Sequence, residues 1–157
     1  AALGASSDIM GHFDKSIVGR DGWLMQLGTL AGNPIAAAAG LKTMEVLKRE
    51  GSYERLRNIG RTLQDMQERA LDVAGISHQI CGDETLFDIF FTTRQCRDYR
   101  SAEHDDLERN ATYNATLRQH GIFKSPGKLY PSLAITPNDL DHTKAAVEHA
   151  VRSISEL

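Results

Sequence analysis

The stretch GTLAGNPIAAAAG, residues 28–40, restricts the fold more than any other part of this 157-residue chain. Asn33 followed by Pro34 predicts a helix start, because asparagine caps free backbone N–H groups and proline suits the first helical position. Four successive alanines follow, so another backbone can approach this helix closely. The glycine-threonine loop before it offers N–H groups and a hydroxyl that, beside a helix N-terminus, can bind an anion. A capped helix packed tightly in a core remains the alternative.

The composition predicts one globular domain, with 41% hydrophobic and 25% charged residues. The net charge is −3 and the basic residues are scattered, so the sequence does not predict a basic surface for binding nucleic acid. No apolar run approaches the roughly 20 residues of a membrane helix. The first residues resemble no secretory signal, so we expect a cytoplasmic protein in which Cys81 and Cys96 are reduced.

Hydrophobic periodicity then predicts an alternation of helices and short strands after an irregular first 31 residues. The expected elements are a helix after Asn33, a helix from a Ser52 cap to Gly75, strands at 76–81 and 86–93, a helix at 102–120, two strand pieces around the turn at 125–127, and a helix after a capping box at 136–139. This order predicts an α+β fold, with helices on one face of a small, mostly antiparallel sheet.

The usual catalytic and metal-binding patterns are not supported by residue spacing. GIFKSPGK, residues 121–128, has its glycines too far apart for a phosphate loop, and Leu129 stands where a magnesium ligand belongs. Only His104 and Glu108 share a helix face in the segment HDDLE, and two ligands seldom make a specific site. We therefore expect no metal site and no nucleophile-histidine constellation.

Four segments resemble class III aminotransferases, which are pyridoxal-phosphate enzymes of fold type I. QLGTLAGNPIAAAAGLKTMEVL is similar to the signature that follows the cofactor lysine, and LGASSDIM resembles the GG-x-x-DIM stretch before it. TLFDIFFT resembles the SMF-x-x-FFT strand of the glutamate-1-semialdehyde aminomutase branch, and residues 121–151 resemble that branch's closing segment. The resemblance covers essentially the whole chain.

The resemblance implies a homodimer that shares its pyridoxal 5'-phosphate sites across the interface. Thr29, helped by the backbone at Gly28, would bind the cofactor phosphate of the neighbouring subunit. Residues 1–40 would be the end of the large cofactor-binding α/β domain, with the phosphate loop and the start of a connecting helix. Residues 41–157 would be the C-terminal small domain, in which Lys124, Ser125 and Tyr130 edge the pocket for an amino acid substrate.

Two departures from the family pattern qualify this expectation. The family's catalytic lysine lies just before the GG-x-x-DIM stretch, and none of the lysines at 15, 42, 48, 124, 128 and 144 matches it. We therefore expect no catalytic residue here and a C-terminal part of a longer enzyme, or a partner of a separate upstream chain. Tyr130 stands where the aminomutase branch has a glutamate, which favours an aminotransferase. The alternatives are the aminomutase itself and a non-catalytic α+β interaction module.

Overall fold

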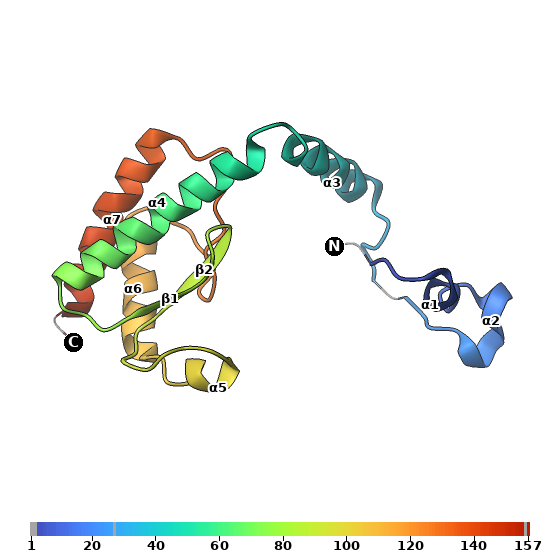
Figure 1. The fold of residues 1–157 in the computed structure, drawn as a ribbon, viewed down its shortest axis with the longest axis horizontal. Helices are drawn as coiled ribbons and strands as arrows, with labels where there is room; N and C mark the ends of the chain where they lie inside the picture. The colour runs from blue at the N-terminus through green and yellow to red at the C-terminus, as the bar shows by residue number, and fades with distance from the viewer. Residues whose placement is uncertain (1–2, 27, 156) are drawn as a thin grey trace. The chain divides into compact units, whose positions relative to one another are not determined.

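The computed structural model describes residues 3–26, 28–155 and 157. It divides into two compact units, Ala1–Glu45 and Val46–Leu157, and each is described by itself. The first unit contains α1 (Ser7–Gly11), α2 (Lys15–Gly22) and most of α3 (Pro34–Leu47). Helix α3 continues past Glu45 into the second unit. The second unit also contains α4 (Ser52–Val73), β1 (Gln79–Asp83), β2 (Leu86–Phe90), α5 (Tyr99–Ala102), α6 (Leu107–Gln119) and α7 (Pro137–Ser155) (Figure 1).

The first unit holds short helices and no buried side chain among its described residues. Helix α2 is interrupted at Gly19, whose φ of 72° is left-handed. Local hydrogen bonds hold α1 and α2 together: the Trp23 indole donates to the Phe13 carbonyl at 3.2 Å, and His12 Nδ1 lies 2.6 Å from the Gly22 carbonyl oxygen. The largely irregular start that the sequence predicts therefore contains two short helices.

The second unit contains the core, which lies between three helices and one face of β2. Helix α4 buries a residue every fourth position, at Ile59, Leu63, Gln67 and Leu71, because this spacing keeps side chains on one helix face. Figure 1 shows α4, α6 and α7 beside the β1–β2 hairpin. The larger core cluster is built from Leu71, Ile76, Ile89, Phe91, Tyr113, Leu117, Ala146, Val147, Ala150, Val151 and Ile154.

Strands β1 and β2 pair antiparallel across a two-residue turn, with Asp83 opposite Leu86 and Gln79 opposite Phe90. Side chains of β2 alternate, so that Phe87 and Ile89 are buried while Asp88 lies on the other face. A small antiparallel sheet packed against helices confirms the predicted α+β fold.

The two strand pieces predicted around residues 125–127 are wrong. The described residues there form only the isolated bridges Phe87–Leu129 and Ser125–Lys128. Leu129 exchanges hydrogen bonds of 2.7 and 3.3 Å with Phe87, but the ladder stops there. Pro131, two residues after Leu129, carries no N–H group to donate, so the ladder cannot continue on that side.

Two predicted helix starts also shift. Gly51, in a left-handed conformation with φ of 76°, is the N-cap of α4, and the hydroxyl of Ser52 donates instead to the Val46 carbonyl at 2.9 Å. The helix expected from residue 102 begins only at Leu107, capped by Asp106. Asp105 is held away from a helical path because its carboxylate accepts the Phe91 backbone N–H at 2.6 Å.

Candidate functional site

The loop ahead of α3 has the capped geometry that its sequence predicts. Asn33 Oδ1 accepts the backbone N–H groups of Ile35 and Ala36, each at 3.0 Å, so asparagine is the N-cap. Two backbone bonds close the loop, from Ala31 to the Gly28 carbonyl at 2.9 Å and from Asn33 to the Leu30 carbonyl at 3.1 Å. The loop is thus a pair of tight turns that ends at a helix N-terminus.

Gly28 and Thr29 are exposed at the start of this loop. A Cβ at Gly28 would lie 3.3 Å from that of Ala31, so the turn is tight at this position. Among the described residues, neither the Thr29 hydroxyl nor the N–H groups of Gly28 and Thr29 donate a hydrogen bond. A hydroxyl and N–H groups beside a helix N-terminus match the needs of a phosphate group, so these residues fit the expected cofactor phosphate. Leu27, which precedes them, lies outside the described residues.

The second unit brings Lys124, Ser125 and Tyr130 together on one cavity of about 360 Å³. Leu63 of α4 and Thr143 of α7 line the same cavity, so it lies between these helices and the segment that follows α6. Tyr130 is 61% exposed. Their predicted position at the edge of a substrate pocket remains a prediction.

Lys124 is the most constrained of these three residues. Its side chain is 9% exposed and its Nζ lies 3.6 Å from Oδ1 of Asp88, whose side chain is 14% exposed. The ammonium also donates to the Ser125 carbonyl at 3.0 Å. Burial lowers the pKa of Lys124 and raises the pKa of Asp88, and each partner opposes the other's shift. Lys124 and Asp88 therefore form an ion pair that is largely buried from solvent.

Asp88 and Asn114 contribute to this site and were missed by sequence reasoning. Asn114 of α6 donates to the Pro126 carbonyl at 3.3 Å and so connects the helix to the turn after Lys124. A signal for Asp88 was present, because a single acid in the apolar strand LFDIFF needs a partner on the face opposite the core. Asn114 had none, since an asparagine in a helix is most often solvated.

The histidines, acidic residues and cysteines considered in the sequence lie as follows. Within residues 3–26, 28–155 and 157, no three His, Cys, Asp or Glu side chains are grouped to hold a metal ion. The helices of this described part are all too short or too polar to cross a membrane. Cys81 and Cys96 are free thiols, and the Cys81 sulfur lies 4.0 Å from the Cys96 carbonyl oxygen. His104 Nε2 lies 2.7 Å from the Arg94 guanidinium and not against Glu108.

The chain is homologous to the class III pyridoxal-phosphate aminotransferases and aminomutases, and it matches them as a C-terminal portion, which confirms the predicted resemblance. It is 35% identical over 156 residues to a glutamate-1-semialdehyde 2,1-aminomutase of Desulfosudis oleivorans, covering 99% of this chain and 35% of that protein. The chain therefore spans about a third of the length of the curated relatives it matches. No family model matches it.

Solved structures show the same similarity. An omega-transaminase from Sphaerobacter thermophilus superposes with a TM-score of 0.78 at 27% identity, over 96% of this chain and 34% of that one. A beta-phenylalanine aminotransferase from Variovorax paradoxus superposes with a TM-score of 0.67, also at 27% identity, over 92% of this chain and 33% of that one.

Proposed function

We propose that this chain is part of a homodimeric pyridoxal-phosphate aminotransferase. The reaction would move an amino group between an amino acid and a 2-oxo acid or another carbonyl acceptor. The observation that carries the proposal is the exposed Gly28–Thr29 turn beside the capped N-terminus of α3, in a chain whose relatives are named transaminases and aminomutases. An upstream part of the same enzyme would supply the catalytic lysine, and the cytoplasm would be its location.

The residues of this chain would bind and orient rather than react. The Thr29 hydroxyl and the backbone at Gly28 would donate hydrogen bonds to the cofactor phosphate of the neighbouring subunit. Pyridoxal phosphate, when bound, supplies the electron sink that stabilises negative charge next to the substrate nitrogen. Asp88 would hold Lys124 at the edge of the substrate pocket, where Ser125 and Tyr130 add polar groups.

Two other functions remain in competition. Intramolecular amino transfer, as in a glutamate-1-semialdehyde 2,1-aminomutase, is favoured by the name of the 35% identical relative. The presence of Tyr130 in place of the branch's glutamate favours the aminotransferase. A non-catalytic interaction module would keep the fold without the lysine.

The first test is the intact mass under denaturing conditions of the protein from its native source. A mass above that of the 157-residue chain, or a second co-purifying polypeptide, is the expected result. A mass equal to that of this chain alone would favour the interaction module.

The second test is Thr29→Ala in the complete enzyme. We expect pyridoxal phosphate to bind about tenfold more weakly, because a hydrogen bond to a charged group is lost. Thr29→Ser keeps the hydroxyl and is the matched control, with affinity close to that of the wild type. An unchanged dissociation constant in Thr29→Ala would show that Thr29 does not bind the phosphate.

A further inference from the structure

The two cysteines of the second unit are separated in the sequence but lie close together in the fold. Cys81 is the middle residue of β1, and Cys96 belongs to the segment 91–98, which connects β2 to α5 without helix or strand. The Cys81 sulfur lies 4.0 Å from the Cys96 carbonyl oxygen. Both thiols are free and both residues are partly buried. The fold therefore brings two free thiols to one place.

The two sulfur atoms are themselves near neighbours. Burial raises the pKa of the Cys81 thiol, and its interaction with the Cys96 thiol raises it further. One thiol affects another in this way only at short range. The Cys96 sulfur is turned to the inside of its own segment, where it lies 3.9 Å from the Arg94 carbonyl oxygen and 4.0 Å from that of Ser101. Two free thiols at this range can be joined by a disulfide bond.

The thiol pair lies on the outer face of the β1–β2 hairpin. Cys81 is opposite Asp88 in the ladder, and directly opposite residues of an antiparallel pair point to the same face. Phe87 and Ile89, on either side of Asp88, are buried in the core, so Asp88 and Cys81 point away from it. Cys96 therefore approaches Cys81 on the face that no core helix covers.

The segment that carries Cys96 is accessible to a small molecule and is free of ladder hydrogen bonds. Residues 93–95 and 97–98 are exposed. Short-range bonds shape the segment, since the Ser101 hydroxyl oxygen accepts the N–H groups of Arg97 and Asp98 at 2.8 and 2.9 Å. An exposed segment held only by local bonds can shift at low cost, which allows the sulfur atoms to reach bonding distance. In the cytoplasm, which we propose for the enzyme, disulfides are usually transient and redox-sensing.

We propose that Cys81 and Cys96 are a redox-sensitive pair that forms a reversible disulfide bond, with a low-molecular-weight disulfide such as oxidised glutathione as the oxidant. The Cys96 thiolate attacks one sulfur of the small disulfide, whose S–S bond breaks and releases one thiol. The Cys81 thiolate then attacks the Cys96 sulfur, releases the second thiol and completes the internal bond. The protein thiols lose two electrons and two protons, which the two released thiols carry away. The bond ties segment 91–98 to β1, and the proposal stands whether or not Thr29 binds a cofactor.

The test is a redox titration of the 157-residue chain with mixtures of reduced and oxidised glutathione. Remaining thiols are blocked with N-ethylmaleimide and intact masses are recorded. We expect an oxidised chain two hydrogens lighter than the reduced one, without blocked thiols, from which trypsin releases residues 70–94 linked to residues 95–97. The ratio of squared reduced to oxidised glutathione at half oxidation should be about tenfold or more higher for the native chain than for the chain in urea, because the fold holds the thiols together.

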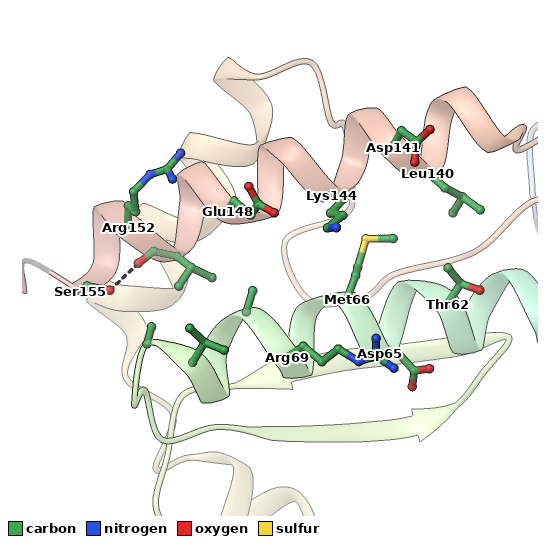
Figure 2. Close-up of a pocket in the computed structure, with 14 residues that line it drawn as sticks. Thr62, Asp65, Met66, Arg69, Leu140, Asp141, Lys144, Glu148, Arg152 and Ser155 are labelled. Carbon is green, nitrogen blue, oxygen red and sulfur yellow. Dashed lines mark hydrogen bonds between the residues drawn. The ribbon is translucent and has the colours of Figure 1, made fainter.

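The double variant Cys96→Ser with Thr62→Cys is the matched control. Thr62 is exposed on α4, at the groove of about 680 Å³ that α4 forms with α7 (Figure 2), whereas Cys81 points away from these helices. Positions 62 and 81 are 19 residues apart, against 15 for the natural pair, so both pairs close at nearly the same entropic cost in the unfolded chain. In the native state we expect mixed disulfides with glutathione and no internal bond.

Cys81→Ser and Cys96→Ser should each stop at the mixed disulfide, and all variants should keep the circular dichroism spectrum of the wild type. The proposal is overturned by a native chain that retains glutathione on a cysteine without closing the internal bond, or that links to a second copy instead. It is also overturned by a half-oxidation ratio no higher in the native chain than in urea, or by a control variant that closes an internal bond as readily as the wild type.

Discussion

The two units of the chain differ in how much structure their own residues can hold. In the first unit no described residue is buried, and Leu30, Ile35 and Leu41 are between 69 and 79% exposed. Among the described residues of the second unit, fourteen hydrophobic side chains are buried in two clusters. Both units contain helices, but only the second contains the burial that supplies most of the free energy of folding.

The difference shows that local sequence signals and tertiary packing act separately. Helix α3 is specified by its Asn33 cap and its alanines, yet it buries nothing of its own. A 14-residue helix is marginal in water without packing. We infer that α3 depends on surfaces outside the first unit, as the proposed enzyme would provide, whereas the second unit contains what it needs to fold.

Replacing a buried leucine and an exposed one is expected to give the largest contrast. Leu71 is fully buried and Leu41 is 69% exposed. Leu71→Ala should lower the free energy of unfolding by about 2–5 kcal/mol, because it removes buried methyl groups and leaves a cavity. Leu41→Ala should change it by less than about 0.5 kcal/mol. Urea denaturation followed by circular dichroism measures both, and equal effects would show that α3 packs in the isolated chain.

A helical glycine in each unit gives the next contrast. A Cβ at Gly60 would lie 1.7 Å from the Glu84 carbonyl oxygen, whereas a Cβ at Gly40 would meet nothing within 4 Å. Gly60→Ala should cost about 2–3 kcal/mol, because the β1–β2 turn must move away from α4. Gly40→Ala should raise the helix content slightly, since alanine has the higher helix propensity. Thermal melts that show no loss for Gly60→Ala would contradict the close approach.

An ion pair in each unit gives a smaller contrast. Lys124→Met leaves the largely buried Asp88 without its partner and should cost about 1–3 kcal/mol at neutral pH. Lys42→Met removes an exposed pair with Glu45, at 2.6 Å, and should have almost no effect.

The loss in Lys124→Met should also depend on pH. The pKa of Asp88 is higher in the folded state than in the unfolded state. The protonated carboxyl therefore stabilises the folded state at a pH below the unfolded pKa, and this stabilisation is lost as the pH rises through the folded pKa. The cost of Lys124→Met should therefore shrink on acidification. A loss that is independent of pH would mean that Lys124 acts by packing alone.

The smallest effect is expected from the exposed carboxylate of Asp83. Hydrogen bonds from the Thr85 backbone and from Arg57 lower its pKa from 3.8 to about 2. A lowered folded pKa gives stability that is present above pH 3.8 and is lost as the pH falls toward 2. Asp83→Asn should flatten this acid slope of the melting temperature. Asp14, whose pKa is also lowered by hydrogen bonds from Ser16, is the counterpart in the first unit. No described residue of that unit is buried, so we expect Asp14→Asn to leave the acid slope of the second unit's melting transition intact.

Features set by neighbouring residues could be predicted from the sequence. The Asn33 cap is one, and the capping box of α7 is another, since Thr136 and Asp139 exchange hydrogen bonds of 2.8 and 3.3 Å as expected. Pairings between distant segments could not be predicted. Asp105 leaves the helical path to bind the backbone of Phe91, and Lys124 finds Asp88 36 positions away, and no local pattern encodes either contact.

The residues of the candidate site also fall into those that a local motif predicts and those that only the fold brings together. The loop residues Gly28 and Thr29 were found by a motif, and their role stays a prediction. The shared cavity of Lys124, Ser125 and Tyr130 became visible only with the fold, because a turn, α4 and α7 must meet to form it.

The position of α7 along the chain has a consequence for biosynthesis. This helix supplies five of the eleven residues of the larger core cluster, the last of them Ile154. When both strands and α6 have been synthesised, α7, which packs against Leu71, Ile89 and Phe91, has therefore not yet been made. Until then these side chains and an open hairpin are exposed on the nascent chain, which is when chaperones recognise such segments. The second unit should thus complete its fold in one late step, once residue 154 has been released.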